Sequence, residues 1–454
     1  MSKVKRIFEI TQEINFLSPQ KEFSLYWNSF LESGLGRIYQ RVPWSELVNE
    51  FRIKDLNHGR VSIFSPQGKL ALMFLKAYTG FSDRRLIEHL NGSIHFQLFC
   101  GIFLGLDKLV DYKIVSHIRT ELSKHLNIVT CQKVLSEAWK PYMDCKHVVL
   151  TDATCYETDM RFPTNVKLLW ECTSWVYYQL KLTCKYLKIR MPRNKYYEQE
   201  QKYLNYSRKR KKNHKETTVR TRSLLYLLEK LLELQDSIVA QNEARMNFSR
   251  KYYQRIKVIH RILTQQQTMF KTHESVKNRI VSIDKSYIRP IIRGKEVKKV
   301  EFGAKVNMIQ VDGINFIEHL SFNAFNEGTR LISSVRCART LVGKITHLAG
   351  DAIYATNKNR KYTTRNKITT SFTRKGKPGK YEDQRVIISR ELRKERATRM
   401  EGSFGTEKEH YGLYRIKART EKNEILWIFF GIHTSNAVKI AHRLAQENVH
   451  KNIA

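Results

Sequence analysis

One acid stands among many basic residues in the stretch 388–420, which reads ISRELRKERATRMEGSFGTEKEHYGLYRIKART. The pattern predicts a helix on which Glu401 and Lys408, seven positions apart, share a face two turns apart. Basic residues crowd the same stretch: Arg396, Arg399, Arg415, Lys417 and Arg419. Glu401 is therefore either half of an ordinary helical charge pair or a metal ligand beside a track of phosphate contacts.

Two aspartates elsewhere in the chain favour the metal-ligand interpretation. The apolar residues 148–150 lead into Asp152, and a second apolar stretch, 345–350, leads into Asp351. Each stretch predicts a buried strand that delivers an aspartate at its C-terminal end, where open sheets bind ligands. Two such aspartates and one helical glutamate provide the oxygen ligands that a pair of hard cations needs to bridge phosphate oxygens during in-line displacement.

The chain resembles a bacterial insertion-sequence transposase with an RNase H-like DDE catalytic domain. Five pieces carry this resemblance, in the family's order: FSPQGKLALMFLKAYTGFSDRRLIEHLNGSIHFQLFCGI, LTDATCYETDMRFPTNVKLL, RGKEVKKVEFGAKV with FNEGTRL, AGDAIYATNKNR, and RMEGSFGTEKEHYGLYRIKART. The last piece contains the glutamate, six residues and then a lysine. The better-known signature of such enzymes also has a tyrosine and an arginine before the glutamate. Ala397 stands four positions before Glu401, so that part of the signature is absent.

The resemblance implies an enzyme that binds the ends of an insertion sequence and catalyses metal-dependent DNA strand cleavage and strand transfer. Asp152 would bridge two Mg²⁺ ions, with Mn²⁺ as an alternative, while Asp351 would hold one ion and Glu401 the other. The rivals by residue type are Asp144, Asp159 and Asp312. Asp312 precedes Gly313, a pair typical of a turn, whereas Asp159 is the serious competitor although it lies past the predicted strand end.

Several further residues are candidates for contacts with DNA. They are Lys408, Arg399, Tyr411, Asn359, Arg360 and the basic run Arg208, Lys209, Arg210, Lys211 and Lys212. Lys408 either binds a phosphate, or orders the nucleophile, or forms a salt bridge. Asn359 and Arg360 match the family's motif after the second aspartate and are expected to position that loop. Trp170 and Trp175 either stack on a displaced base or, as is commoner beside a sheet, pack in a core.

The whole chain is strongly basic. Its 454 residues carry 81 Lys and Arg against 43 Asp and Glu, a net charge of +38. This excess indicates a polyanionic partner, and we expect double-stranded DNA, as transposon ends and target. We expect no membrane contact and no signal peptide, and hence a bacterial cytoplasmic, nucleoid-associated protein. Seven scattered cysteines without a Cys-x-x-Cys pair favour reduced thiols over a zinc site.

The pattern of apolar and turn residues predicts an α/β chain, α+β overall, in three parts. Residues 1–140 are expected to form an all-α N-terminal domain for DNA-end binding, or for dimerisation and packing, with Ser65 and Ser82 as helix caps. Residues 141–186 and 276–454 are expected to form an RNase H-like mixed sheet with flanking helices. Residues 187–275 would interrupt this sheet as a helical hairpin. The hairpin is either a structural excursion or an arm that reaches along DNA or across a dimer.

Finer features are expected inside the sheet domain. A turn at 293–294 should join two strands, a helix should begin in 326–335, and residues 357–387 should form a basic loop suited to phosphate contacts. Two functions remain open. One is an active transposase that works as a homodimer in its DNA complex, and the other is a catalytically silent relative that represses by occupying transposon ends. The presence of all three acids favours the first.

The net charge generates a first prediction: DNA binding should weaken steeply as salt rises. Phosphate contacts release counterions, so about eight contacts would give a log–log slope of affinity against salt of roughly −7. Fluorescence anisotropy with a labelled duplex at several salt concentrations measures this slope. A nearly flat dependence would mean that the charge of +38 serves something other than DNA.

Overall fold

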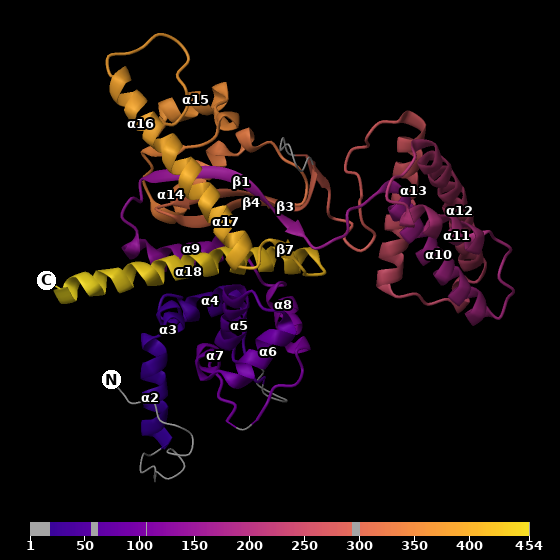
Figure 1. Cartoon of the computed structure of the whole chain (residues 1–454), viewed down its shortest axis with the longest axis horizontal. Helices are drawn as coiled ribbons and strands as arrows, with labels where there is room; N and C mark the ends of the chain where they lie inside the picture. The colour runs from indigo at the N-terminus through magenta and orange to yellow at the C-terminus, as the bar shows by residue number, and fades with distance from the viewer. Residues whose placement is uncertain (1–18, 56–61, 106, 293–299, 454) are drawn as a thin grey trace.

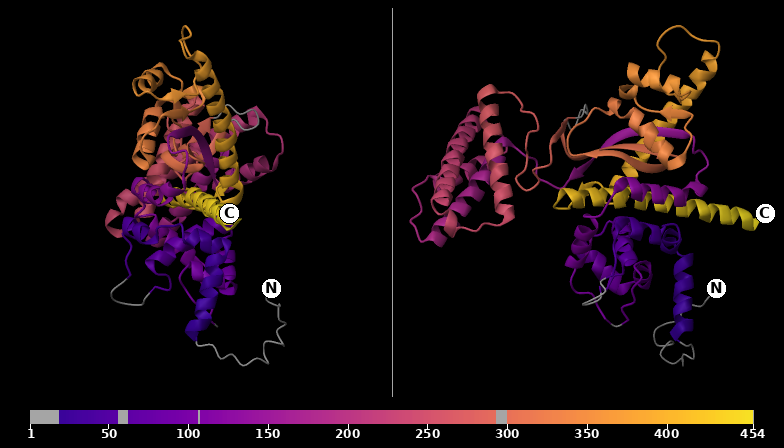
Figure 2. Two further views of the ribbon diagram at one scale, coloured as in Figure 1. Left: turned by 90° about the vertical axis from the view of Figure 1, so that its left-hand side faces the viewer. Right: turned by 180° about the vertical axis from the view of Figure 1, so that it is seen from behind.

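The structure, a computed structural model, describes residues 19–55, 62–105, 107–292 and 300–453. Figure 1 shows three parts: a group of helices near the N-terminus, a sheet with flanking helices, and a helical bundle that stands apart from the sheet. The long helix α18 (Glu421–Ile453) runs between the first two parts, as the rear view in Figure 2 also shows. The predicted turn at 293–294 and residues 1–18 lie outside the described residues.

The first part is helical, as predicted. Its helices are α2 (Pro19–Glu32), α3 (Gly34–Tyr39), α4 (Trp44–Phe51), α5 (Pro66–Thr79), α6 (Asp83–Gly92), α7 (Ile94–Phe99), α8 (Lys113–Leu122) and α9 (Ile128–Trp139). The caps read from the sequence are confirmed, because Ser65 and Ser82 accept hydrogen bonds from the backbone N–H groups of Gly68 and Arg85. Gly80 ends α5 in the left-handed conformation, with φ of 62°. Helix α5 is buried almost all round because α18 covers it, with the rings of Phe74 and Phe430 5.1 Å apart.

The sheet is mixed, and β1 lies at its centre. Its strands are β1 (Val148–Thr158), β2 (Pro290–Ile292), β3 (Val300–Val311), β4 (Ile314–Ser321), β5 (His347–Ala349), β6 (Thr369–Thr370) and β7 (Arg415–Ile416). Strand β3 pairs antiparallel with β1, β4 and β2, whereas β5 pairs parallel with both β1 and β6. The short β7 pairs parallel with the far end of β1. The expected mixed α/β class is confirmed.

Two local features of the sheet bear on the predicted site. Asp312 and Gly313 have positive φ values of 48° and 79°, and they form the turn between β3 and β4 that the Asp-Gly pair predicts. The expectation that a strand ends at Asp152 is wrong, because β1 continues to Thr158 and places Asp152 in mid-strand. Residues 153–158 extend the strand because they pair with β3, where Gly303 lets the two backbones approach closely, and half of them are β-branched or aromatic.

Helices flank the sheet and replace part of a predicted loop. They are α14 (Leu331–Val342), α15 (Asn357–Arg365), α16 (Glu382–Glu395), a π-helical turn η5 (Arg396–Met400) and α17 (Glu401–His410), with short 3₁₀ turns η3 (Glu327–Thr329) and η4 (Ala352–Tyr354). The predicted loop at 357–387 is therefore wrong at both ends. Thr356 caps α15 by accepting a hydrogen bond from the N–H of Asn359, although the helix has too few apolar residues to show a period.

The inserted part is larger than the hairpin expected at 187–275. Four helices form it: α10 (Asn165–Leu187), α11 (Tyr196–Arg208), α12 (His214–Gln241) and α13 (Arg250–Thr272). They share one core that is separate from the sheet's core, and α10 supplies buried residues such as Leu169 and Val176. Residues 165–186, predicted as part of the sheet domain, therefore belong to the bundle.

The separate core generates a prediction about stability. Leu228 of α12 is fully buried, so Leu228→Ala should lower the free energy of unfolding of the bundle by about 2–5 kcal/mol. Tyr226→Ala on the same helix is the control, because that ring is 70% exposed. Urea unfolding followed by circular dichroism measures both changes. Equal effects of the two substitutions would contradict the assignment of a bundle core.

Candidate functional site

The sheet register brings the two predicted aspartates together. Strands β1 and β5 run parallel, and their pairing ends with Leu150 opposite Ala349; Asp152 and Asp351 each lie two residues further along the chain. Neighbouring strands lie about 4.8 Å apart, and opposite residues of a parallel pair point to the same face. Asp351 follows the end of β5 and opens η4, where its side chain accepts a hydrogen bond of 2.6 Å from the N–H of Ala352. The two carboxylates are close enough for the charge of Asp351 to act on Asp152.

Asp152 sits in a negative environment that one arginine offsets. Its Oδ2 accepts a hydrogen bond of 2.6 Å from Nη1 of Arg396, and its Oδ1 accepts one of 2.8 Å from the N–H of Ala153. Burial raises the pKa of the Asp152 carboxyl, and the charges of Glu327 and Asp351 raise it further against these two donors. A positive charge beside the Asp152 carboxyl stabilises its ionised form. In this structure the guanidinium of Arg396 supplies that positive charge.

Glu401 is not brought into this pair. It is the first residue of α17, directly after the π-helical turn that carries Arg396, and it is exposed. Among the residues that the structure describes, no group of three or more His, Cys, Asp or Glu side chains is arranged to hold a metal ion. The π-helical turn shifts the register between α16 and α17, and such turns occur often at functional sites. The oxygen donors of Asp152 and Asp351 fit a hard cation, and Glu401 is the nearby helix-borne acid that could complete the set.

Lys408 approaches the same face of β1. Asp152, Thr154 and Tyr156 alternate along the strand and share one face. The Nζ of Lys408 donates a hydrogen bond of 3.1 Å to Oγ1 of Thr154 and lies 5.9 Å from the centre of the Tyr156 ring. Lys408 therefore points toward the strand that holds Asp152. Glu401, which was predicted to share its helical face, lies at the exposed start of the helix.

Glu407 is a central residue that the sequence did not reveal. Its carboxylate is fully buried and accepts hydrogen bonds from the hydroxyl of Tyr156 on β1 and the amide of Asn315 on β4. Burial raises the pKa of this carboxyl, although both donors and the nearby Lys439 and Lys408 oppose the shift. The network fixes α17 to the sheet and so positions the helix that carries Glu401. The partners lie far apart in the sequence, so no local spacing could have identified it.

The other predicted contact residues have varied surroundings. Tyr411 is buried, which raises the pKa of its hydroxyl to about 12. Asn359 is also buried, and its amide donates to the carbonyls of Gly328 and Tyr354, which positions the loop after Asp351 as expected. Arg360 donates to backbone carbonyls at Ala355 and Thr373. Arg399 is half exposed and pairs with Glu395.

The rival acids and the tryptophans have structural roles in the fold. Asp312 accepts a hydrogen bond of 2.8 Å from Arg443 at the β3–β4 turn, and Asp159 lies 3.8 Å from Arg415. Asp144 lies in the exposed connection before β1. Trp170 stacks on Tyr196 and Tyr203 in the bundle, and Trp175 packs against Tyr252. The packing interpretation of both tryptophans is therefore the one that the fold supports.

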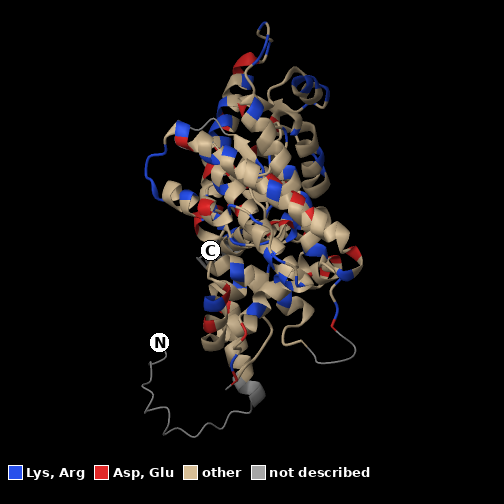
Figure 3. Cartoon of the chain, turned by 90° about the vertical axis from the view of Figure 1, so that its right-hand side faces the viewer, with Lys and Arg blue, Asp and Glu red and all other residues tan. Residues whose placement is uncertain are grey.

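Basic side chains lie over all three parts of the molecule. The predicted basic run Arg208, Lys209, Arg210, Lys211 and Lys212 is exposed between α11 and α12, where Lys209 pairs with Glu216. Figure 3 shows further Lys and Arg along the loop between β6 and α16. In the described part of the chain, no helix has the length and apolar character needed to span a membrane.

Comparison with known proteins gives one match. Residues 28–121, which span α3 to most of α8 and the end of α2, match a family described as a transposase domain (DUF772). This match supports a transposase and hence a DNA-processing enzyme of a mobile element, and it does not reach the sheet or its acids. No curated protein and no solved structure matches the chain.

The buried Glu407 generates a prediction about pH. Its pKa is raised in the folded state, so the folded chain holds a proton that the unfolded chain has lost once the pH exceeds the usual value of about 4.3. Stability should therefore fall as pH rises from there to the raised pKa, by up to about 1.4 kcal/mol per pH unit. Glu407→Gln should remove this fall, because an amide does not ionise.

Chemical denaturation at a series of pH values measures the slope for each variant. Glu409→Gln is the matched control, since Glu409 lies on the same helix and is exposed. A Glu407→Gln variant that keeps the slope of the unmodified chain would show that this carboxyl does not carry the pH dependence.

Proposed function

We propose that the chain is a DDE transposase that binds the ends of an insertion sequence and cuts and joins DNA strands in an RNase H-like domain. The strand order β4-β3-β1-β5-β6, with β3 antiparallel to its neighbours, supports the RNase H-like assignment. So does the chain order, in which α14 leads to β5 and α16 follows β6. The match to the transposase domain at 28–121 supports the same function independently.

The observation that carries the proposal is that Asp152 and Asp351 each lie two residues beyond the paired Leu150 and Ala349, where the charge of Asp351 acts on the Asp152 carboxyl. Two carboxylates, one on a strand and one just after the end of a strand, are suited to divalent cations such as Mg²⁺ or Mn²⁺. Asp152 and Asp351 would hold the ions, and Glu401 at the start of α17 would be the third ligand. When bound, a pair of such ions lowers the pKa of the attacking water or 3′-hydroxyl and stabilises the leaving oxygen.

The basic residues around the acids would orient the DNA. Lys408, beside Thr154, would bind a phosphate oxygen next to the scissile bond. Arg396 neutralises Asp152 in the absence of other cations, and on release its guanidinium would be free to take a phosphate in a bidentate contact. The net charge of +38 supports double-stranded DNA as the partner, and we include a homodimer in the DNA complex in the proposal.

One observation favours a second candidate, a catalytically silent relative that represses by binding transposon ends. Arg396 is paired with Asp152, and Glu401 stays exposed outside any three-ligand group of the described residues. If this arrangement persists on DNA, the chain would bind without cutting. Cleavage assays therefore separate the two candidates directly.

The triad generates the next prediction. The variants are Asp152→Asn, Asp351→Asn and Glu401→Gln, and each removes the charge of one proposed metal ligand while keeping the side-chain shape. Each should therefore lower Mg²⁺-dependent nicking by at least about 100-fold, and DNA affinity should stay within about threefold of the unmodified chain. Nicking and gel shift on the same duplex from the element's end measure both. Asp159→Asn is the control, because that exposed acid lies past β1 and should keep full activity.

Two outcomes would count against the assignment. Nicking near the unmodified level in one triad variant would remove that residue from the site. Binding without any nicking by the unmodified chain would favour the silent relative.

A further inference from the structure

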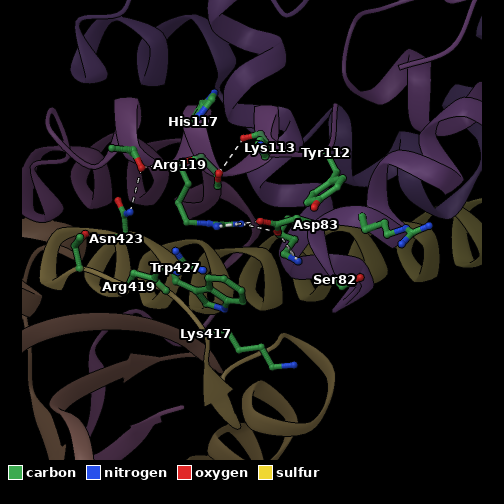
Figure 4. Close-up of a pocket in the computed structure, with 16 residues that line it drawn as sticks. Ser82, Asp83, Tyr112, Lys113, His117, Arg119, Lys417, Arg419, Asn423 and Trp427 are labelled. Carbon is green, nitrogen blue, oxygen red and sulfur yellow. Dashed lines mark hydrogen bonds and ion pairs between the residues drawn. The ribbon is translucent and has the colours of Figure 1, made fainter. Parts of the chain in front are cut away.

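A basic pocket lies between the N-terminal helices and the segment that leads from β7 into α18. Its volume is about 750 Å³. Six Lys or Arg side chains line it against a single carboxylate, Asp83. The basic residues are Lys76, Arg84, Lys113, Arg119, Lys417 and Arg419. Figure 4 shows that the labelled side chains come from two separate regions of the chain, the N-terminal helices and the segment that contains Trp427.

The floor of the pocket is a buried ionic network with excess positive charge. Arg119 donates two hydrogen bonds to Asp83, of 2.8 and 3.3 Å, and the Nζ of Lys76 lies 2.9 Å from the same carboxylate. Trp427 lies against both cations, with its ring centre 4.7 Å from Cζ of Arg119 and 5.3 Å from Nζ of Lys76. One carboxylate thus faces two buried cations, and the indole ring helps to hold them in place.

The rim of the pocket adds further cations, which form no ion pair with an acid among the described residues. Lys113 stands at the start of α8, and Lys417 and Arg419 follow β7. All three are exposed, and none forms an ion pair with a residue in the described part of the chain. Like charges held together at a rim repel one another, which favours an anionic ligand that contacts them in common.

We propose that this pocket binds phosphate groups of the DNA backbone and holds the N-terminal helices and the sheet on one DNA strand. This inference rests on the proposed function. It adds to the protein a DNA-contact site that is separate from the three acids. Arg and Lys on the rim would contact successive phosphates, while the Arg119–Asp83–Lys76 floor would keep the potential positive without binding the strand itself.

A continuous backbone suits the pocket better than a small phosphate compound for two reasons. The cations are spread along two chain segments instead of converging on one point. The pocket also adjoins β7, which pairs with Glu157 and Thr158 of β1. The distance from Thr158 to Asp152 along β1 is about 20 Å, at about 3.3 Å per residue. This distance corresponds to roughly six base pairs of duplex DNA. A strand fixed in the pocket could therefore reach the acids.

The test compares two triple variants of the full-length chain. In the first variant, the pocket variant, alanine replaces the three rim cations Lys113, Lys417 and Arg419. In the second variant, the control, alanine replaces Lys54, Lys124 and Lys133. These lysines are exposed and lie outside the pocket, so the control loses the same amount of positive charge. Affinity for a duplex carrying the element's end is measured at several salt concentrations by fluorescence anisotropy. The pocket variant should bind at least about tenfold more weakly, and its log–log slope should be smaller by about 2–3, while the control changes by less than one.

Two results would overturn the proposal. Equal affinity and slope in the pocket variant and the control would mean that the pocket does not contact DNA. Loss of binding to inorganic pyrophosphate, measured by calorimetry, with unchanged DNA binding would assign the pocket to a small phosphate ligand. Because the acids are intact in both variants, a failure here is distinct from a failure of the proposed function, in which the unmodified chain would not bind or cut the duplex at all.

Discussion

The register of β1 against β5 is the constraint on which the account depends. Asp152 and Asp351 are 199 positions apart, and only the parallel pairing of Leu150 with Ala349 makes them neighbours. A slip by one residue would turn Asp152 to the other face of the sheet. Strand β3 secures β1 on its other edge by antiparallel pairing from Val149 to Glu157, so the position of Asp152 is fixed from both sides. The insertion of a whole helical bundle between β1 and β3 is tolerated because the bundle has its own core.

Buried polar networks then attach the helices to this strand. Glu407 links α17 to Tyr156 and Asn315, while Glu424 links α18 to Thr158 and to Lys285 through bonds of 2.6 Å. Buried charges are costly unless paired, and they contribute more to a specific arrangement than to net stability. In this protein they fix the direction of α17, whose exposed first residue is Glu401, and of α18, which closes the basic pocket against the N-terminal helices. The face that carries Asp152 and the basic pocket are thus parts of one framework built on β1.

Local signals in the sequence predicted local structure well. Ser65, Ser82 and Asp312 each satisfy a backbone requirement within a few residues, so their roles as caps and turn could be predicted directly. The full length of β1 could not, because its second half is stabilised by pairing with β3 and β7 rather than by an apolar run. The role of Glu407 could not be predicted either, since its partners come from distant strands. The resemblance named the three acids, and the structure brings two of them together.

The most direct test of the central claim is to locate the bound metal itself. Fe²⁺ in place of Mg²⁺, with ascorbate and peroxide, generates radicals that cut the polypeptide beside the ion, and mass spectrometry identifies the cut positions. We predict cuts next to Asp152 and Asp351 in the free chain that Mg²⁺ suppresses, joined by cuts next to Glu401 when DNA is bound. Cuts at other positions, or cuts at these positions that excess Mg²⁺ does not suppress, would contradict a metal site at the centre of this sheet.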